Sequence, residues 1–362
     1  MHSFGLDVAY HRAEGDFLWY FDQNGRETQV LDLVGSYGAT LLGHNPPALT
    51  AHLQQALQRN PANLVQASVR SAATRLAQRL NEECQRRMQA DYCASFFNSG
   101  AEAVEAAIKH LLLLRRHRLE RESEAELLRV RNLLHRGFSL ATLDRSKCSD
   151  PLFTDSAFEN PMTFLHELQR SHARQIASPP TILALEHSYH GLTLGALGLT
   201  FNKKFRLPFA EQLLPVQFIS PSPESFRAAA NQHRCRLLTL GESSGTLAFD
   251  GIFTSNVLGL FLEPVLGEGG VLPLLPEVIS TLADVAAQEK ILVVADEIQS
   301  GMGRTGTLFA WERSKHRGPD FLLLSKFLGG GLAKISAVLS QRGQTDDEFG
   351  IIHASTFAED EL

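Results

Sequence analysis

Short, uninterrupted apolar runs, each followed directly by a polar residue, constrain the fold of this chain more than any other feature of its sequence. Five such runs occupy residues 93–97, 181–185, 258–262, 291–295 and 321–324. Runs of this length, separated by stretches with helical periodicity, are typical of strands that are buried on both faces of a mostly parallel sheet. The sequence therefore predicts an α/β fold in which helices flank a mostly parallel central sheet.

The polar residues that follow these runs predict where a ligand site lies. They are Asn98, Glu186, Glu263, Asp296, and Ser325 with Lys326. In open α/β sheets, ligands bind beyond the carboxyl ends of the strands. We therefore expect these side chains to converge on one site.

Composition narrows the class of protein further. The chain is 44% hydrophobic, which excludes a mainly disordered chain. Its formal net charge is -6, so it lacks the overall positive charge that is typical of proteins that bind nucleic acid. Its four cysteines form no CxxC pair, so we expect no disulfide framework and a reducing, cytoplasmic compartment. No apolar run is long enough to predict a membrane span, and no HExxH or paired Cys/His spacing predicts a metal site.

Two of the strand-end residues carry side chains that are suited to cofactor chemistry. A buried lysine is unfavourable unless its amine is used or paired, so Lys326 predicts a covalent role such as a Schiff base, with a lysine that extends into solvent as the alternative. Asp296 is suited to a cationic nitrogen, a metal or a helix N-terminus. The glycines that follow spell GxGxxG, but residues 297–300 separate them from the strand, so we reject a dinucleotide-binding loop.

The run at 93–97 leads into a predicted helix start. Ser99 suits the N-cap position, and Gly100 and Ala101 then place free backbone N–H groups in the first turn. Such a helix start can bind phosphate, although simple capping is the alternative. No lysine follows the glycine, so the segment is not a P-loop.

Seven segments occur in the order LDLVGSYGATLLGHNPPAL, FFNSGAEAVEAAIK, EHSYHGLTLGALGLT, FLEPVLGEGG, VVADEIQSGMGRTG, PDFLLLSKFLGGGL and HASTF. Together they resemble the class III, fold-type I, pyridoxal-phosphate-dependent aminotransferases, the family of ornithine, acetylornithine and 4-aminobutyrate aminotransferases. The resemblance extends from about residue 19 to residue 357. It implies pyridoxal 5′-phosphate as the cofactor, and an amino donor and a carbonyl acceptor as small-molecule substrates.

The resemblance also implies roles for the residues around the cofactor ring. Lys326 resembles the lysine that forms a Schiff base with the cofactor, and Asp296 resembles the carboxylate that keeps the ring nitrogen protonated. Tyr189 takes the position of the aromatic residue that stacks on the ring, and His190 belongs to the same signature. Ile298 would press on the opposite face of the ring.

The cofactor phosphate is implied to bind at the helix start. Ser99, Gly100 and Ala101 match the family's phosphate-binding turn. Thr356 resembles the threonine that reaches the phosphate of the neighbouring subunit. The resemblance therefore implies a homodimer with shared active sites.

Three further residues are implied to lie near the ring hydroxyl or the substrate. Gln299 would lie near the ring hydroxyl. Tyr37 matches a substrate-side position, with a buried core aromatic as the alternative. Glu268 matches an acid that faces a carboxylate-binding arginine, with a structural ion pair as the alternative.

The expected domain organisation follows the resemblance, with one departure. We expect residues 1–50 to belong to a small domain and residues 51–345 to form the large cofactor-binding domain. Residues 346–362 are expected to begin a segment that leads to a C-terminal small domain, which is apparently missing from this chain. Residues 111–180 are expected to be an insertion unusual for the family, with an amphipathic surface helix followed by a loop.

The predicted function is a PLP-dependent aminotransferase that moves an amino group from a donor to an acceptor by a ping-pong mechanism. A related aminomutase, racemase or decarboxylase on the same scaffold is one alternative. An aminotransferase domain of a larger multidomain biosynthetic protein is another, and a nicotinamide oxidoreductase is a more distant third. Neither nucleic acid nor a membrane is an expected partner.

Overall fold

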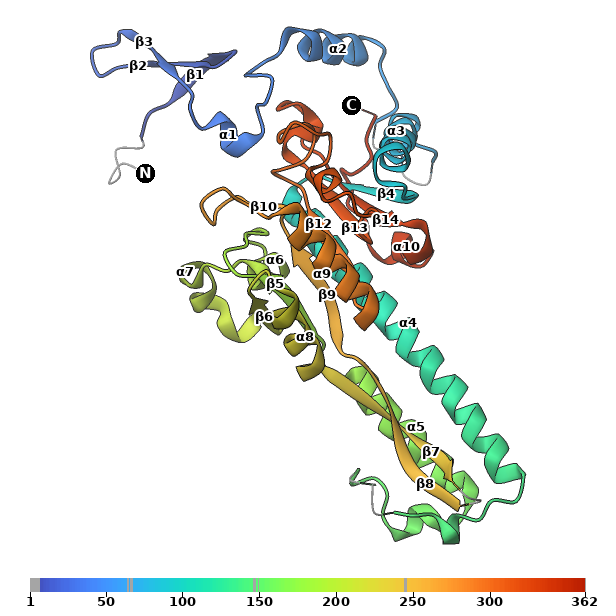
Figure 1. Ribbon diagram of the computed structural model, residues 1–362. Helices are drawn as coiled ribbons and strands as arrows, with labels where there is room; N and C mark the ends of the chain where they lie inside the picture. Colours follow the sequence, from blue (N-terminus) through green and yellow to red (C-terminus); the bar gives the residue numbers. More distant parts are fainter. Residues whose placement is uncertain are drawn as a thin grey trace.

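The computed structural model describes residues 7–63, 65, 68–145, 148, 150–243 and 246–361. Its centre is a seven-stranded sheet with the strand order β4-β14-β13-β12-β9-β5-β6 (Figure 1). The strands are β4 (Tyr92–Phe97), β5 (Thr181–Leu185), β6 (Val216–Ile219), β9 (Val257–Leu262), β12 (Val293–Asp296), β13 (Phe321–Leu324) and β14 (Ser336–Gln341). Only β14 runs antiparallel to its neighbours. The predicted α/β fold and all five predicted strands are therefore confirmed.

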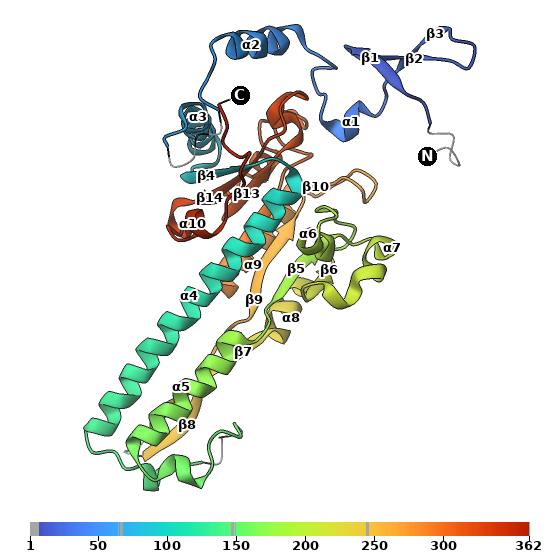
Figure 2. The same ribbon diagram turned by 180° about the vertical axis from the view of Figure 1, so that it is seen from behind.

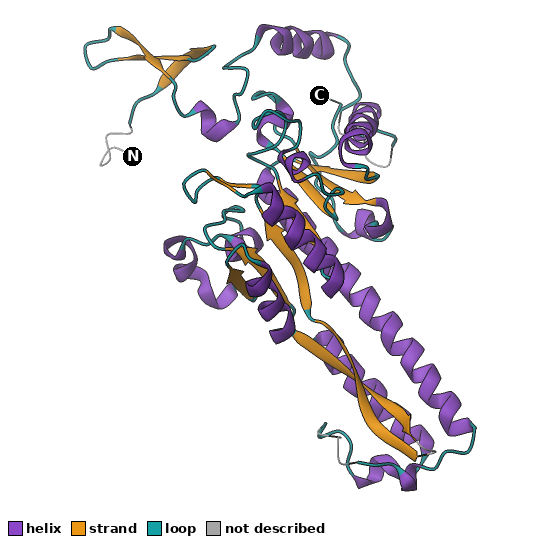
Figure 3. Cartoon of the chain, in the orientation of Figure 1, coloured by secondary structure: helices purple, strands orange, loops and turns teal. Residues whose placement is uncertain are grey.

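Helices cover both faces of this sheet and bury it (Figure 3). On one face, α3 (Ser71–Met88), α8 (Pro223–Gln232) and α9 (Pro276–Glu289) contribute to one hydrophobic cluster. On the other face, the first turns of α4 (Gly100–His135) and α6 (Leu194–Leu199) form a second cluster. Successive residues of β13 point into opposite clusters, which explains why this run is apolar throughout.

The N-terminal residues form a separate antiparallel sheet. Its strands are β1 (Tyr10–Glu14), β2 (Phe17–Phe21) and β3 (Glu27–Leu31), and α1 (Gly35–Gly38) and α2 (Pro47–Gln58) lead from it to the large sheet. Figure 1 shows this small sheet lying apart from the central sheet. The proposed domain limits at residues 50 and 345 remain predictions.

A long arm extends from the central domain (Figures 1 and 2). It consists of the distal part of α4, the helix α5 (Pro161–Ala177), and a hairpin of β7 (Arg234–Ser243) and β8 (Thr246–Ser255). The predicted helix is present, but it is one continuous 36-residue helix with the segment that starts at Gly100. The predicted loop is wrong for 161–177, which is helical because its apolar positions pack on the hairpin.

The arm has its own hydrophobic core, in which four phenylalanines meet and Phe164 and Phe249 are fully buried. Its fully buried histidine is paired: His172 contacts Ser123 Oγ at 2.9 Å and the Leu238 carbonyl oxygen at 2.7 Å. The arm is therefore a packed substructure rather than a solvated helix with a loose loop.

Short elements complete the description: α7 (Lys203–Arg206), α10 (Phe349–Ile352), β10 (Val265–Leu266), β11 (Leu272–Pro273), and the 3-10 helices at Leu140–Thr142, Asp155–Phe158, Leu207–Gln212, Ala310–Ser314, Lys326–Gly329 and Arg342–Gln344. Among the described residues, no helix combines the length and the apolar character that a membrane span requires.

Candidate active site

Asp296 and Lys326, on neighbouring parallel strands, define the carboxyl edge of the sheet. Asp296 is the last residue of β12, and Lys326 follows the end of β13. Lys326 has a φ of 38°, a left-handed conformation that non-glycine residues adopt rarely and that clusters at functional sites. Burial lowers the pKa of its amine, and the charges of Asp296 and Glu263 act against this shift. The lowered pKa favours the neutral amine, which is the nucleophilic form.

A buried histidine holds Asp296. His190 Nδ1 donates a hydrogen bond to Asp296 Oδ2 at 2.7 Å, and the Ile298 N–H donates to Oδ1 at 3.0 Å. Burial lowers the pKa of His190, but the hydrogen bond and the charge of Asp296 raise it, and the net shift is upward. The two hydrogen bonds therefore fix the Asp296 carboxylate in a buried position.

Glu263, the residue after β9, fixes the segment that carries Tyr189. Its Oε1 accepts a hydrogen bond from the Tyr189 N–H at 2.7 Å, and its Oε2 accepts one from the Gly267 N–H at 3.2 Å. Burial raises the pKa of Glu263 to about 7. One side chain thus positions the half-buried Tyr189 beside the buried pair of Asp296 and His190.

The first turn of α4 begins beside Ile298. Ser99 and Glu102 form a capping box, in which the Ser99 and Asn98 N–H groups donate to the Glu102 carboxylate at 3.1 Å and 2.6 Å. The N–H groups of Gly100 and Ala101 have no partner among the described residues.

The contact between Gly100 and Ile298 brings this helix start to the strand-end pair. A Cβ atom at Gly100 would lie 3.0 Å from Ile298 Cδ1, so a larger residue would push the two segments apart. Free N–H groups at the positive end of a long helix form an anion site. The structure thus brings a potential phosphate seat next to the segment that carries Asp296.

On the solvent side of the site, α1 is tied to the segment after β12. Gln299 Nε2 donates to the Tyr37 carbonyl oxygen at 3.2 Å, and Arg304 Nη2 donates to the Gly38 carbonyl oxygen at 2.8 Å. Tyr37 is 78% exposed, so its alternative as a buried core aromatic is wrong.

Glu268 lies on the same side as Tyr37. Burial raises the pKa of Tyr189, and the charges of Glu268 and Tyr37 add to this shift. Glu268 makes no hydrogen bond or ion pair with the described residues, so nothing there supports the structural ion pair. It lines a cavity of about 500 Å³ together with His187, Phe201 and Lys203. The cavity also includes Ser188, the residue before Tyr189.

Thr356 follows α10, in a segment that packs on the start of α4. The preceding residue, Ser355, accepts a hydrogen bond from Asn98 Nδ2 at 2.8 Å. His353 stacks near Phe97 at a centroid distance of 5.1 Å. The segment of Thr356 therefore lies near the helix start of its own chain, and its predicted contact with a neighbouring subunit stays a prediction.

Two contributors were not assigned a role from the sequence. Glu263 was expected at the site only as a strand-end residue, and its bond to Tyr189 joins segments that are distant in sequence. Arg304 was not singled out, because no local pattern indicates that its guanidinium reaches α1.

The sheet has an aspartate and a lysine at adjacent strand ends, and a helix N-terminus in contact with the segment after the aspartate. This arrangement defines a cofactor-binding α/β domain of fold type I. The description can be made narrower: the model of the class-III aminotransferase family matches residues 3–362, and the chain belongs to this family. Class-III aminotransferases depend on pyridoxal 5′-phosphate.

Curated relatives and solved structures agree with this membership. The chain is 29% identical over 359 residues to the aminotransferase PigE of a Serratia species, and 28% identical over 362 residues to the acetylornithine aminotransferase of Streptococcus mutans. These matches cover 97% and 98% of this chain, but 31% and 68% of the two relatives. The ornithine aminotransferase of Toxoplasma gondii has the same fold, with a TM-score of 0.64 at 20% identity over 98% of this chain and 64% of that chain.

The described residues fit pyridoxal phosphate. A buried carboxylate is available for the ring nitrogen, a half-buried lysine for the carbonyl carbon, and two helix N–H groups without a partner among the described residues for the phosphate. His190 Nε2 is also buried without a partner among the described residues. A polar atom in that condition is unfavourable unless a bound group completes the site.

Proposed function

We propose that this chain catalyses pyridoxal-phosphate-dependent transamination between an amino donor and a carbonyl acceptor. The observation that carries the proposal is the position of Lys326, a half-buried amine with a lowered pKa directly after β13, beside Asp296 at the end of β12. A partly buried lysine is unfavourable unless its amine is used or paired.

Each residue would have a distinct task. When bound, pyridoxal phosphate supplies an electron-withdrawing ring that stabilises negative charge on the substrate carbon. Asp296, ionised and held by His190, would keep the ring nitrogen protonated. Lys326 would hold the cofactor and then move a proton to and from the substrate carbon, since a neutral amine near this site can act as a base.

The remaining residues would bind and orient. Tyr189, fixed by Glu263, would stack on the ring, and Ile298 would contact the other face. Ser99, Gly100 and Ala101 would bind the phosphate at the start of α4.

Gln299 would lie near the ring hydroxyl of the cofactor. For substrate recognition we propose Tyr37 and Glu268, which lie on the open side of the site. The names of two relatives, an acetylornithine aminotransferase and an ornithine aminotransferase, favour a free amino acid with a side-chain amine as the donor. We propose a 2-oxoacid as the acceptor.

The working unit is proposed to be a cytoplasmic homodimer with shared active sites. Large apolar residues are exposed in segments that flank the site in sequence, namely Leu33, Val34, Leu194, Val271 and Ile351. A subunit interface would cover such residues. All four cysteines are free, which supports a reducing compartment.

Thr356 is proposed to contact the phosphate of the neighbouring subunit. The test mixes Lys326→Ala and Thr356→Ala subunits and measures cofactor retention at the one site that keeps Lys326. A contact across the interface predicts the same retention as in a heterodimer of Lys326→Ala with wild type, because the site that keeps Lys326 receives the intact Thr356 of its Lys326→Ala partner. Weaker retention in the mixed heterodimer would contradict it, and would indicate a contact within one chain, next to Asn98 and Ser355.

The decisive experiment for the function combines labelling with nitrogen transfer. The chain is loaded with pyridoxal phosphate and reduced with borohydride, and the modified lysine is mapped by mass spectrometry; we expect Lys326. The unreduced protein is then given ¹⁵N-labelled ornithine or N-acetylornithine with 2-oxoglutarate, and label should appear in glutamate. Attachment to another lysine would overturn the site. Attachment at Lys326 with a changed donor and no transfer would instead favour an aminomutase, racemase or decarboxylase.

A further inference from the structure

A second cavity lies at the opposite, amino edge of the central sheet. It has a volume of about 550 Å³ and includes Val257 at the start of β9, Val293 at the start of β12, and Asp320 directly before β13. Small-molecule sites typically measure about 300–1,000 Å³. The cavity is thus large enough for a metabolite, and it is separated from Lys326 by the length of the strands.

One stripe of α4 forms a wall of this cavity. Leu111, Leu114, Arg118, Arg121 and Glu122 all line it. Their spacing of three and four residues places them on one face of the helix. Leu111 and Leu114 pack in the hydrophobic cluster on the sheet, and the three charged residues follow them along α4. Figure 2 shows that α4 continues beyond the sheet into the arm. The wall is therefore apolar at one end and charged at the other.

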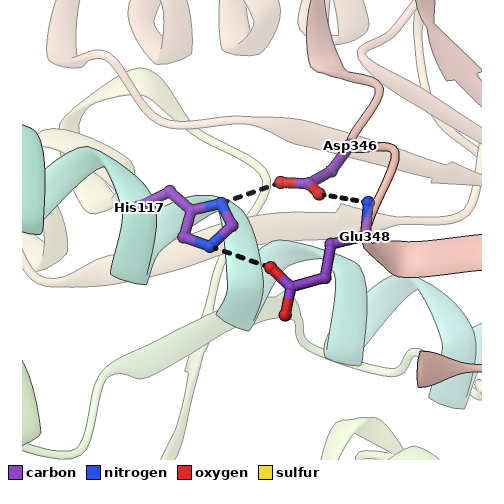
Figure 4. Close-up of side chains that lie close together, drawn as sticks. All are labelled: His117, Asp346 and Glu348. Atoms are coloured by element: carbon purple, nitrogen blue, oxygen red, sulfur yellow. Dashed lines mark hydrogen bonds and ion pairs between the residues drawn. The ribbon is translucent and has the colours of Figure 1, made fainter. Parts of the chain in front are cut away.

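Some charged groups of the cavity are already occupied. His117 is bound by two carboxylates, with Asp346 Oδ2 at 2.8 Å from Nδ1 and Glu348 Oε2 at 3.4 Å from Nε2 (Figure 4). Because each carboxylate binds a different ring nitrogen, the three groups join α4 to the segment before α10. Arg118 Nη2 donates to the Ser255 carbonyl oxygen at 2.9 Å.

Three other charged groups of the cavity form no side-chain hydrogen bond or ion pair within the described part of the chain. They are Arg121, Lys290 and Arg317, and the charge of Arg317 acts against the burial that raises the pKa of the neighbouring Asp320. Glu122 Oε2 is buried and lacks any hydrogen-bond donor among the same residues. A buried acceptor without a donor is unfavourable, and unpaired guanidinium groups favour carboxylate or phosphate oxygens.

We propose that this cavity binds a small organic anion that also carries an N–H donor. Arg121 and Arg317 bind its carboxylate or phosphate, Lys290 adds positive charge, and Glu122 accepts the N–H hydrogen bond. The apolar residues at the strand starts contact the body of the ligand. Two sources share this chemistry: an amino acid, through its carboxylate and ammonium groups, and a nucleoside monophosphate, through its phosphate and base amine. The proposal does not depend on the transaminase function.

The chain contains a built-in reporter for this site. Of its two tryptophans, Trp311 lines the cavity and Trp19 lies in β2. A Trp19→Phe variant therefore leaves Trp311 as the only tryptophan. We would titrate this variant separately with L-glutamate and with AMP, follow Trp311 fluorescence, and measure affinity by calorimetry.

We expect saturable binding of at least one ligand, and the ligand that binds identifies the source. Arg121→Ala, Arg317→Ala and Glu122→Gln should each weaken binding about tenfold or more, since hydrogen bonds to charged groups contribute that much. Arg313→Ala is the matched control, because Arg313 is exposed nearby but does not line the cavity. Arg317 is exposed, so its variant should fold even if the α4 variants do not.

Three results would overturn the proposal. The first is the absence of saturable binding of either ligand at millimolar concentration. The second is an unchanged affinity in the folded Arg317→Ala and Arg121→Ala variants, and the third is a loss of affinity in Arg313→Ala equal to that in those variants. A Lys326→Ala variant should bind with wild-type affinity, which separates this cavity from the active site. Loss of binding in that variant would place the ligand at the carboxyl edge instead.

Discussion

Replacement of Asp296 by asparagine tests the proposed electrostatics of the active site most directly. Asparagine has nearly the same shape, and its side-chain oxygen can still accept the hydrogen bond from His190 that the carboxylate accepts at 2.7 Å. The substitution therefore removes the negative charge and leaves the packing almost unchanged. Asp296 is only 4% exposed, so water cannot replace the lost charge.

The size of the effect follows from that burial. Removing one partner of a buried ion pair leaves the other uncompensated, which costs about 3–5 kcal/mol. If this loss falls on the protonated ring nitrogen in the transition state, the rate should fall about 10²- to 10⁴-fold. Binding of the cofactor should decrease much less, because Lys326 and the start of α4 do not depend on this charge.

Rapid mixing provides the assay, since the absorbance of the bound cofactor changes in a single turnover with an amino donor. Asp320→Asn is the matched control: Asp320 is also a partly buried aspartate beside β13, its Oδ2 accepts from the Val293 N–H at 2.8 Å, and it lies at the opposite edge of the sheet. We expect the control to lose stability but to keep its rate. A rate for Asp296→Asn within about threefold of wild type would refute the reasoning.

Three other predictions concern stacking, the arm and pH. Tyr189→Phe should lower the steady-state turnover rate slightly and Tyr189→Ala should lower it strongly, because a ring face rather than a hydroxyl stacks on a planar cofactor. Equal losses of rate in the two variants would indicate a role for the phenol. Phe249→Ala should lower the free energy of unfolding by about 3–5 kcal/mol in urea denaturation, because removal of this fully buried ring leaves a cavity. The variant should still bind the cofactor. A change in the free energy of unfolding below about 1 kcal/mol would show that the arm core is loosely packed. Burial raises the pKa of Glu297 to about 7. Between pH 4.5 and 7 the folded chain therefore keeps a proton that the unfolded chain has released, so stability should fall by up to about 3 kcal/mol as pH rises through this window. Urea denaturation at pH 5 and pH 8 should show this fall in wild type and a flatter profile in Glu297→Gln, and parallel profiles would contradict it.

The sequence predicted the central sheet well because its strands are buried on both faces. A run such as 321–324 is apolar at every position, and this pattern does not depend on what packs against it. The hairpin of β7 and β8 was not predicted, because its pattern depends on α4 and α5, which cover it in the arm. The helix α5 was missed for the same reason: its apolar stripe is meaningful only once the hairpin is present.

In the site, as in the fold, the sequence predicted those residues whose signal is local and missed the contacts between distant segments. Asp296 and Lys326 could be identified because each directly follows a strand, and strand ends of a parallel sheet share one edge. Contacts between distant segments, such as the bond from Tyr189 to Glu263 or from Arg304 to Gly38, have no local signature. The cavity at the amino edge was likewise invisible, since it exists only where α4 extends beyond the sheet.

The unbroken course of α4 restricts how the length of this protein can vary. The same helix begins at the proposed phosphate seat, lines the amino-edge cavity and ends in the arm core. Each residue added to an α-helix rotates everything beyond it by about 100°. A single insertion or deletion between Leu111 and Arg129 would therefore turn the arm away from its hairpin, and only changes of about seven or eleven residues would restore the original direction. Among homologues that carry this arm, the distance in sequence from the glycine at the helix start to the arm core should be constant or change in these steps.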